Sequence, residues 1–482
     1  MATPWTPKPG DRVVRHPREE LIGPVHYTVS SRRAQSRALA SPLVLTYVFA
    51  GLISLGTAVL MFPFTHVGGG FTPFVDALFT ATSATTVTGL VTQNTAEYWT
   101  RPGQVVILLL MFVGGLGFMS ITTFLMILIG QRVTLAQRLL VKESLQVDQL
   151  GGLARLAIQI VLVVTGIQVV GFIVLSLRFS TLYVPGEALW QGLFHSVSGF
   201  NNAGFVVLPT DDPTSVSLSE FRLDKIVLGV IGGLIFLGAI SFWAMVDVFR
   251  YRRFSLFSLN TKLVLILTFL FIGIGAFVFF FSEYNNDETL GALSVADKAY
   301  VAVFESISGR TAGFTTVDYG ETEQHTNFFF TSLMFIGGAS ASVAGGIKIN
   351  TLAVVLVAVL STLRGNATAS VFGRQIPESQ VHRAMTIAAA AVMVVFLTAI
   401  MLTFSEAPKE FPFIDLLFES VSAFGTVGLS TGLTGDLSRW GQVILVVSMF
   451  VGRVAPVTLA LAMARSGQRD LYRFAPERVT IG

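Results

Sequence analysis

Four short segments of this chain share one pattern: an apolar run, a serine, a polar turn, and a glycine followed by Leu or Phe. The shared glycines are Gly89, Gly204, Gly313 and Gly428, which lie 115, 109 and 115 residues apart. Glycine lets the backbone adopt conformations that other residues resist, so consecutive carbonyl oxygens can face one axis and replace the hydration shell of a cation. The spacing therefore indicates one unit repeated four times around a cation pathway.

The residues that end each pattern are the candidate ion ligands. A short helix that enters a membrane and stops there carries a partial negative charge at its C-terminal end. Four such ends would attract a cation to the backbone carbonyls that follow, with threonine and asparagine side chains holding the loops. The predicted K⁺-binding residues are Thr86, Val87, Thr88, Gly89, Asn202, Ala203, Gly204, Thr311, Ala312, Gly313, Thr426, Val427 and Gly428.

The composition places these loops in a membrane. Hydrophobic residues make up 52% of the chain and charged residues 13%, and the mean hydropathy is +0.69, a balance that a water-soluble domain of this length would not tolerate. Small residues also help transmembrane helices pack closely, which could explain one loop alone but not four in register. The chain has no cysteine, which excludes disulfides and thiolate sites.

Eight apolar stretches reach the ~20 residues needed to cross a bilayer. They lie near residues 41–62, 103–130, 152–178, 224–250, 261–282, 326–362, 382–404 and 439–464. Each pair encloses a segment that is too short to cross and suits a re-entrant helix, near 73–84, 187–199, 295–308 and 411–423. The predicted fold is an all-α polytopic membrane protein, with four repeats of span, pore helix and span around a pseudo-fourfold central pore.

The four repeats account for almost the whole chain. The predicted parts are a basic N-terminal arm at 1–40, repeat 1 at 41–130, repeat 2 at 152–251, repeat 3 at 261–362 with a broken second span, repeat 4 at 382–464, and a C-terminal tail at 465–482. Of the 32 Lys and Arg residues, 22 lie in segments assigned to one side and seven in loops on the other. Because basic residues stay on the cytoplasmic side, both termini are expected there.

A run of small residues interrupts the second span of the third repeat. Such a run forms a poor helix, and irregular backbone persists at membrane depth only where it lines a cavity or is buried in protein. We expect a gating loop beneath the ion site, with a tightly packed helix of small residues as the alternative. The predicted gate residues are Gly337, Gly338, Ser340, Ser342, Gly345, Gly346 and Lys348, together with Arg453 of the last span.

Two arginines fall at predicted membrane depth, where each costs about 2.5–3.5 kcal/mol on insertion scales. Arg453 is expected to form a positive barrier on the pathway or to pair with carboxylates or carbonyls between repeats. Arg310 would repel a cation if it faced the axis, so we expect it to point behind the loop and pair with Glu305 or Glu419. His195 is expected to pack or to form hydrogen bonds, not to bind a metal.

The four loops resemble the selectivity filters of the Trk/Ktr/HKT superfamily of potassium transporters. They read Thr-Val-Thr-Gly-Leu, Asn-Asn-Ala-Gly-Phe, Arg-Thr-Ala-Gly-Phe and Gly-Thr-Val-Gly-Leu-Ser, and the resemblance, closest to the KtrB membrane subunits of bacterial Ktr systems, runs from about residue 41 onward. It implies K⁺ uptake, often stimulated by Na⁺, by a homodimer in the bacterial cytoplasmic (inner) membrane. It also implies a loop gate in the third repeat and a cytosolic KtrA-like nucleotide-binding ring. Gly89 favours K⁺ within the superfamily.

No residue set points to an enzyme. An intramembrane enzyme would need a nucleophile with its base, paired aspartates or a metal site, and the predicted spans contain none. The chain lacks a P-loop sequence, so any nucleotide is expected to act through the regulatory subunit. The only expected ligands are K⁺ and, as a coupling ion, Na⁺; nucleic acid is not an expected partner. An obligatorily coupled K⁺/Na⁺ or K⁺/H⁺ symporter stays open, because the same loops would serve it.

Overall fold

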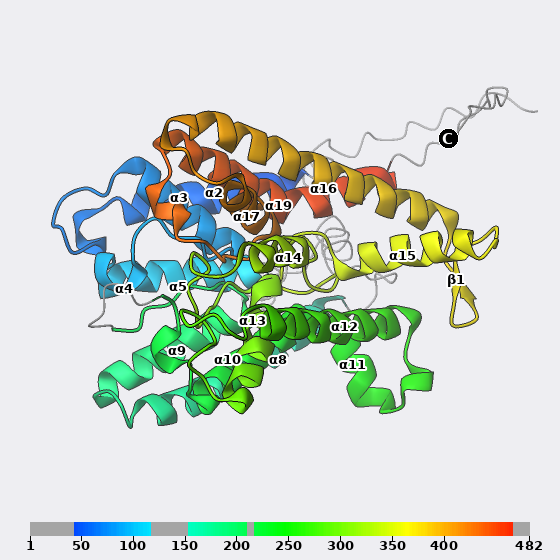
Figure 1. Ribbon diagram of the computed structural model, residues 1–482, viewed down its shortest axis with the longest axis horizontal. Helices are drawn as coiled ribbons and strands as arrows, with labels where there is room; N and C mark the ends of the chain where they lie inside the picture. The colour runs from blue at the N-terminus through cyan, green and yellow to red at the C-terminus, as the bar shows by residue number, and fades with distance from the viewer. Residues whose placement is uncertain (1–42, 117–152, 210–215, 466–482) are drawn as a thin grey trace, which may run out of the picture.

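The computed structural model describes residues 43–116, 153–209 and 216–465, and most of these residues are helical (Figure 1). The expected helical character is therefore confirmed. Within these ranges the only paired strands are β1 (Ser370–Val371) and β2 (Arg374–Gln375), an antiparallel pair that joins two helices. The predicted N-terminal arm at 1–40, residues 117–130 of the first repeat, and residues 466–482 of the predicted tail at 465–482 lie outside the described residues.

Four short helices precede the four shared glycines. Each lies between an earlier helix and a later one in the chain. The short helices are α3 (Phe74–Thr86), α9 (Pro185–Phe200), α13 (Val295–Thr311) and α17 (Phe413–Gly425). The helices before them are α2 (Leu43–Leu60), α8 (Leu153–Phe179), α12 (Leu259–Ser282) and α16 (Glu378–Ser405), and those after them are α5 (Arg101–Leu116), α10 (Lys225–Ala239), α14 (Gln324–Met334) and α19 (Arg439–Arg465).

The other elements connect these helices. They are α4 (Thr95–Tyr98), α11 (Phe242–Tyr251), α15 (Ile349–Leu363), α18 (Leu433–Asp436) and the 3₁₀ turns η2 (Pro63–Thr65), η3 (Ser219–Phe221), η4 (Phe254–Leu256) and η5 (Ala407–Lys409). By length and apolar composition, three helical segments in the described ranges could cross a bilayer alone: Ile158–Phe179, Leu259–Ser282 and Glu378–Ser405. The eight apolar stretches are thus not eight continuous spanning helices.

One predicted span is bent and another is broken. The stretch near 224–250 is not one helix, because α10 and α11 meet at an angle of 99°. The Ser241 side chain accepts a hydrogen bond from the Ala244 amide and so begins a new helix at the bend. In the stretch near 326–362, α14 ends at Met334 and α15 begins at Ile349, with non-helical backbone between them.

The helices pack in a closed circle. Each helix that follows a shared glycine contacts the short helix of the next quarter of the chain: α5 packs on α9, α10 on α13, and α14 on α17. The circle closes where α19 packs on α3, so the last quarter of the chain lies beside the first (Figure 1).

The first residue of each repeated pattern anchors its short helix. These residues are Phe79, Phe194, Phe304 and Phe418, and all four are buried. Burying one such ring in an apolar interior contributes about 1.5–3 kcal/mol. Packing of these rings fixes the position of the loop that follows each short helix.

Candidate functional site

The four shared glycines form a closed ring, called the glycine ring below. A Cβ atom added to Gly89 would meet the loop of Gly204, and one added to Gly204 would meet that of Gly313. The series continues to Gly428 and returns from there to Gly89. The backbone oxygens at these contacts belong to the residues that precede the glycines: Ala203, Ala312, Val427 and Thr88, in ring order.

All four ring positions require glycine for two reasons. Their φ angles are +94° at Gly89, +70° at Gly204, +72° at Gly313 and +95° at Gly428, values that side chains disfavour. A Cβ atom at any of them would also press on a carbonyl oxygen of the next loop. The ring is therefore built from backbone atoms alone, with carbonyl groups as its polar surface.

Three of the four loops share one further feature. Val87, Asn202 and Thr426, each two residues before a ring glycine, adopt left-handed backbone with φ of +59°, +56° and +49°. This conformation costs roughly 1–2 kcal/mol for a residue with a side chain, so surrounding contacts must hold it. In the third loop, Ala312 has φ of −130°. That loop has one residue fewer between its serine and its glycine, so it turns without the left-handed residue.

In the first and fourth patterns, a serine ties the loop to its short helix. The Ser83 hydroxyl accepts a hydrogen bond from the Gly89 amide at 3.0 Å, and the Ser422 hydroxyl accepts one from the Gly428 amide at 3.1 Å. A contact also joins neighbouring loops, because the Asn202 side-chain amide lies 2.8 Å from the hydroxyl of Thr311.

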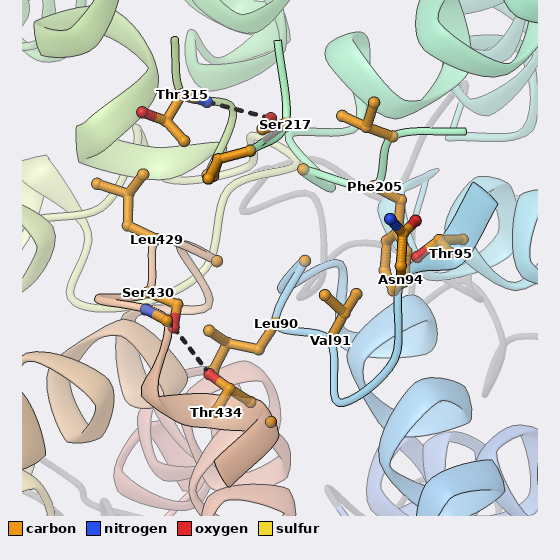
Figure 2. A pocket seen from close by; sticks show the side chains of 18 of the residues that line it. Leu90, Val91, Asn94, Thr95, Phe205, Ser217, Thr315, Leu429, Ser430 and Thr434 are labelled. Carbon is orange, nitrogen blue, oxygen red and sulfur yellow. Dashed lines mark hydrogen bonds between the residues drawn. The ribbon is translucent and has the colours of Figure 1, made fainter. Parts of the chain in front are cut away.

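A vestibule of about 340 Å³ opens above the glycine ring (Figure 2). All four ring glycines and the segments that follow them line this cavity. Figure 2 shows Leu90, Phe205, Thr315 and Leu429 around it, each from a different quarter of the chain. Among the described residues, the lining includes Glu220 and Asp318 and no Lys, Arg or His. The vestibule therefore favours a cation over an anion.

Two buried carboxylates brace the segments that follow the ring. Glu305 accepts hydrogen bonds from the amide and hydroxyl of Thr316, at 2.7 and 2.8 Å, and from the hydroxyl of Tyr319 at 3.2 Å. Glu419 accepts hydrogen bonds from the hydroxyls of Ser430 and Thr434. The two residues thus have matching roles in the third and fourth quarters of the chain.

The expected pairing of Arg310 with one of these carboxylates is wrong. Arg310 is buried, with 2% of its surface exposed. Neither Glu305 nor Glu419 contacts it, because both are already oriented by hydroxyl and amide donors of the following segments. Its Nε and Nη1 atoms have no hydrogen-bond partner among the described residues. Among the described residues, Arg310 is therefore a buried cation that forms no ion pair with a carboxylate.

His195 occupies, in the second short helix, the place that Glu305 and Glu419 hold in the third and fourth. Its Nδ1 atom lies 2.8 Å from the carbonyl oxygen of Gln191, and its ring packs against Phe179 and Phe194. Within the described ranges no cluster of three or more His, Asp or Glu side chains could hold a metal ion.

The residues between α14 and α15, called the small-residue loop below, pack directly under the glycine ring. A Cβ atom at Gly345 would collide with the Thr426 side chain, and one at Gly346 would press on the backbone of Gly425. The loop is also held by the end of α10, because the Ala339 amide donates to the Ala239 carbonyl at 2.9 Å. It is a compact, buried structure and not a helix.

Arg453 crosses from α19 to this loop. One of its terminal nitrogens donates to the Val343 carbonyl of the small-residue loop, and the other donates to the Gly114 carbonyl of α5 at 2.8 Å. Lys348 donates to the Ala344 carbonyl within the loop. Of the alternatives for Arg453, the contacts with carbonyls between quarters are therefore present, and two basic side chains lie beneath the ring.

Ion pairs also join the N-terminal ends of the short helices to the N-terminal ends of the helices that pack on them, and we call these contacts the ion-pair ring. The sequence analysis did not predict them. The third residue of each short helix is acidic, and the helix that packs on it begins with a basic residue in three cases and with Gln324 in the fourth. In those three cases the two residues form an ion pair: Arg101 with Glu187, Lys225 with Asp297 at 3.3 Å, and Arg439 with Asp76 at 2.6 Å. At the fourth corner the residues are Gln324 and Asp415, which cannot form an ion pair.

Glycines in the helices that follow the shared glycines also allow close contact with the short helices. A Cβ atom at Gly114 would collide with the Thr85 carbonyl, and one at Gly452 with the Phe424 carbonyl. In the second quarter the equivalent glycine is Gly238, which meets the Phe200 carbonyl. It lies further along the chain because 21 residues separate Gly204 from the start of α10, whereas 12 separate Gly89 from the start of α5.

The fold and the site define a helical membrane protein in which four short helices and their loops converge on a ring of backbone carbonyls. A family model described as TrkH, a cation transport protein, matches residues 28–471. The chain belongs to this family of cation transport proteins.

Named relatives are similar over almost their full length. The chain is 38% identical to the Ktr system potassium uptake protein B of Bacillus subtilis, over 89% of this chain and 94% of the relative. It is 34% identical to the potassium/sodium uptake protein NtpJ of Enterococcus hirae, over 94% of this chain and 100% of the relative. The crystal structure of the potassium transporter TrkH from Vibrio parahaemolyticus has the same fold, with a TM-score of 0.66 and 15% identity. The match covers 92% of this chain and 87% of that structure's chain.

Proposed function

We propose that this chain carries K⁺ into bacteria through the glycine ring, across the cytoplasmic membrane. The observation that supports this most is the cyclic contact of four loops, each presenting the carbonyl that precedes its glycine to the next loop. Carbonyl oxygens of this kind can replace the water shell of a K⁺ ion. The relatives of 38% and 34% identity carry potassium uptake in their names, which supports K⁺ as the cargo.

The architecture that we propose for this pathway is four repeats around one pore. Each consists of a span, a re-entrant pore helix with its loop, and a second span, within the bounds given from the sequence. The closed circle of helix contacts supports this proposal. The excess of Lys and Arg on one side supports an orientation with both termini in the cytoplasm and the vestibule outside.

The gate that we propose is the small-residue loop, held by Arg453. The loop lies against Thr426, two residues before Gly428 of the glycine ring, and Arg453 ties it to α5 through the Val343 and Gly114 carbonyls. Two positive side chains beneath the ring would oppose the passage of a cation. Opening would then require the loop and Arg453 to separate.

Regulation is proposed from the resemblance to Ktr systems. We expect two copies of the chain to form a homodimer, and a cytosolic nucleotide-binding ring to control the gate from the inner face. Na⁺ could stimulate uptake or be coupled to it; the potassium/sodium uptake protein among the relatives supports a role for Na⁺. Obligatory coupling to Na⁺ predicts that K⁺ uptake stops without Na⁺, and obligatory coupling to H⁺ predicts that it stops without a proton gradient. A gated pore continues in both cases.

Uptake of ⁸⁶Rb⁺ into liposomes that contain the purified protein tests the proposed function. We expect excess K⁺ to block uptake and Na⁺ to compete weakly. Gly89→Ser should relax this discrimination, because a side chain there collides with the Ala203 carbonyl. Gly70→Ser is the matched control, since Gly70 has open space around it and no positive φ. Uptake that neither K⁺ nor Gly89→Ser affects would contradict the proposal.

A further inference from the structure

The chain leaves the membrane core abruptly after α10. Helix α10 ends at Ala239, and α11 departs at 99° to it. In Figure 1, α11 lies beneath the start of α12, at the end of the molecule that also carries β1. Because α10 belongs to the membrane-embedded circle of helices, a helix at nearly a right angle to it runs close to the plane of the membrane.

This segment is fixed in place by side-chain contacts. The Asp247 carboxylate of α11 accepts hydrogen bonds from the Thr261 hydroxyl at 2.7 Å and from the Ser258 amide at 3.3 Å. Lys262 donates to the Ser255 carbonyl at 2.9 Å. These contacts tie α11 and η4 to the first turn of α12. The segment from Phe242 to Leu256, called the α11 corner below, is therefore a defined surface.

The α11 corner exposes apolar and basic side chains together. Phe249 is 77% exposed and Leu256 58%. Tyr251 and Phe254 are also exposed. From residue 242 to residue 262 the chain has four basic residues and one acidic residue, and that acid, Asp247, already accepts two hydrogen bonds. The basic residues are Arg250, Arg252, Arg253 and Lys262.

None of the three arginines forms an ion pair within the described residues. Arg250 instead lies over the ring of Tyr251, with its guanidinium carbon 5.4 Å from the ring centre. A cluster of unpaired arginines beside exposed aromatic rings is typical of a surface that contacts anionic headgroups and inserts its apolar side chains beneath them.

We propose that the α11 corner binds anionic phospholipids. The arginines would pair with the phosphates, and the Phe249 and Leu256 side chains would enter the acyl region next to the end of α10. Two observations favour a lipid over a soluble partner: the corner begins directly at the end of a membrane-embedded helix, and its apolar and basic side chains alternate along one short segment. The proposal depends on the membrane location of the chain and not on its cargo.

The absence of native cysteine allows a direct test. In the Phe249→Cys variant, an environment-sensitive fluorophore is attached to the only thiol, and the protein is placed in nanodiscs. Brominated phosphatidylglycerol or brominated phosphatidylcholine is then added at increasing mole fraction. We expect the anionic lipid to quench the fluorophore at a lower mole fraction than the zwitterionic lipid.

Arginine variants separate charge recognition from apolar contact. Arg252→Gln should raise the mole fraction of brominated phosphatidylglycerol needed for half-maximal quenching by roughly fivefold. Arg364→Gln, an exposed arginine at the end of α15, is the matched control and should change nothing. Equal quenching by both lipids, or an unchanged value in Arg252→Gln, would overturn the proposal. Quenching by neither lipid would also overturn it.

Discussion

Arg439 and Asp76 lie 363 residues apart in the chain, yet their side chains form an ion pair of 2.6 Å. Arg439 is the first residue of α19, and Asp76 is the third residue of α3. The pair joins the last quarter of the chain to the first, and it has counterparts at two of the other three corners. The outer ends of the helices are thus linked in the same cyclic order as the glycine ring.

This pair should contribute measurably to stability. The Asp76 side chain is 4% exposed and that of Arg439 is 56% exposed, so solvent screens much of the attraction. Asp76→Asn should lower the free energy of unfolding by about 1 kcal/mol, because a buried acceptor loses its strongest donor. Thermal unfolding in detergent measures the effect. If the loss in the double variant equalled the sum of the losses in Asp76→Asn and Arg439→Gln, the two residues would not be coupled.

The open corner of the ion-pair ring can be closed by one substitution. Gln324→Arg places a guanidinium at the position held by Arg101, Lys225 and Arg439 at the other corners. It should stabilise the protein by up to about 1 kcal/mol through Asp415. The gain should vanish when Asp415→Asn is added. A gain that persists in the double variant would show that Asp415 is not the partner.

Substitution of Gly428 should strongly reduce transport. In Gly428→Ala the added methyl group meets the Thr88 carbonyl, and φ of +95° is unfavourable for alanine. We expect ⁸⁶Rb⁺ uptake to fall at least tenfold. Gly373→Ala is the matched control, because Gly373 also has a positive φ but has open space around it. Equal losses in both variants would assign the effect to backbone strain alone.

Release of the small-residue loop should raise transport. Arg453→Gln loses the hydrogen bonds to the Val343 and Gly114 carbonyls, so ⁸⁶Rb⁺ uptake without a regulator should increase several-fold. Lys348→Gln also removes a positive charge but leaves both of these bonds. If the two variants increase uptake equally, charge and not the bridge closes the path. No change in either would contradict a gate at this loop.

Arg310 gives a prediction that opposes the usual effect of altering a buried residue. A buried charge without a partner costs several kcal/mol of desolvation, and its Nε and Nη1 atoms are unpaired among the described residues. Arg310→Gln should therefore raise the melting temperature, and Arg310→Met should raise it as well. A lower melting temperature in both variants would show that the guanidinium is satisfied in the folded protein.

The sequence allowed the helical membrane fold to be predicted because the apolar stretches and the glycine spacing are visible in one dimension. The close approach of the glycine loops has the same origin, since Gly89 and its three counterparts stand at matching places in the chain. The bend at Ser241 could not be predicted from hydropathy, which continues through residues 224–250. Its signal is a serine in position to cap a new helix.

Partners of buried polar residues were harder to predict. Arg310 was expected to pair with a carboxylate behind the loop because it would repel a cation if it faced the axis, but Glu305 accepts hydrogen bonds from the Thr316 amide and hydroxyl. Those donors belong to a segment whose path depends on tertiary contacts. The ion-pair ring did have a sequence signal, the acid at the third position of each short helix, but its partners become neighbours only after the helices close into a circle.

Anomalous scattering from Rb⁺ in crystals of the protein tests the central claim most directly, namely that the carbonyls of the glycine ring form a cation site. We predict a peak enclosed by the carbonyl oxygens of Thr88, Ala203, Ala312 and Val427, which is lost when excess K⁺ replaces Rb⁺ and persists when excess Na⁺ is added. The absence of any peak at the ring in well-ordered crystals, or its displacement by Na⁺ as readily as by K⁺, would contradict the claim.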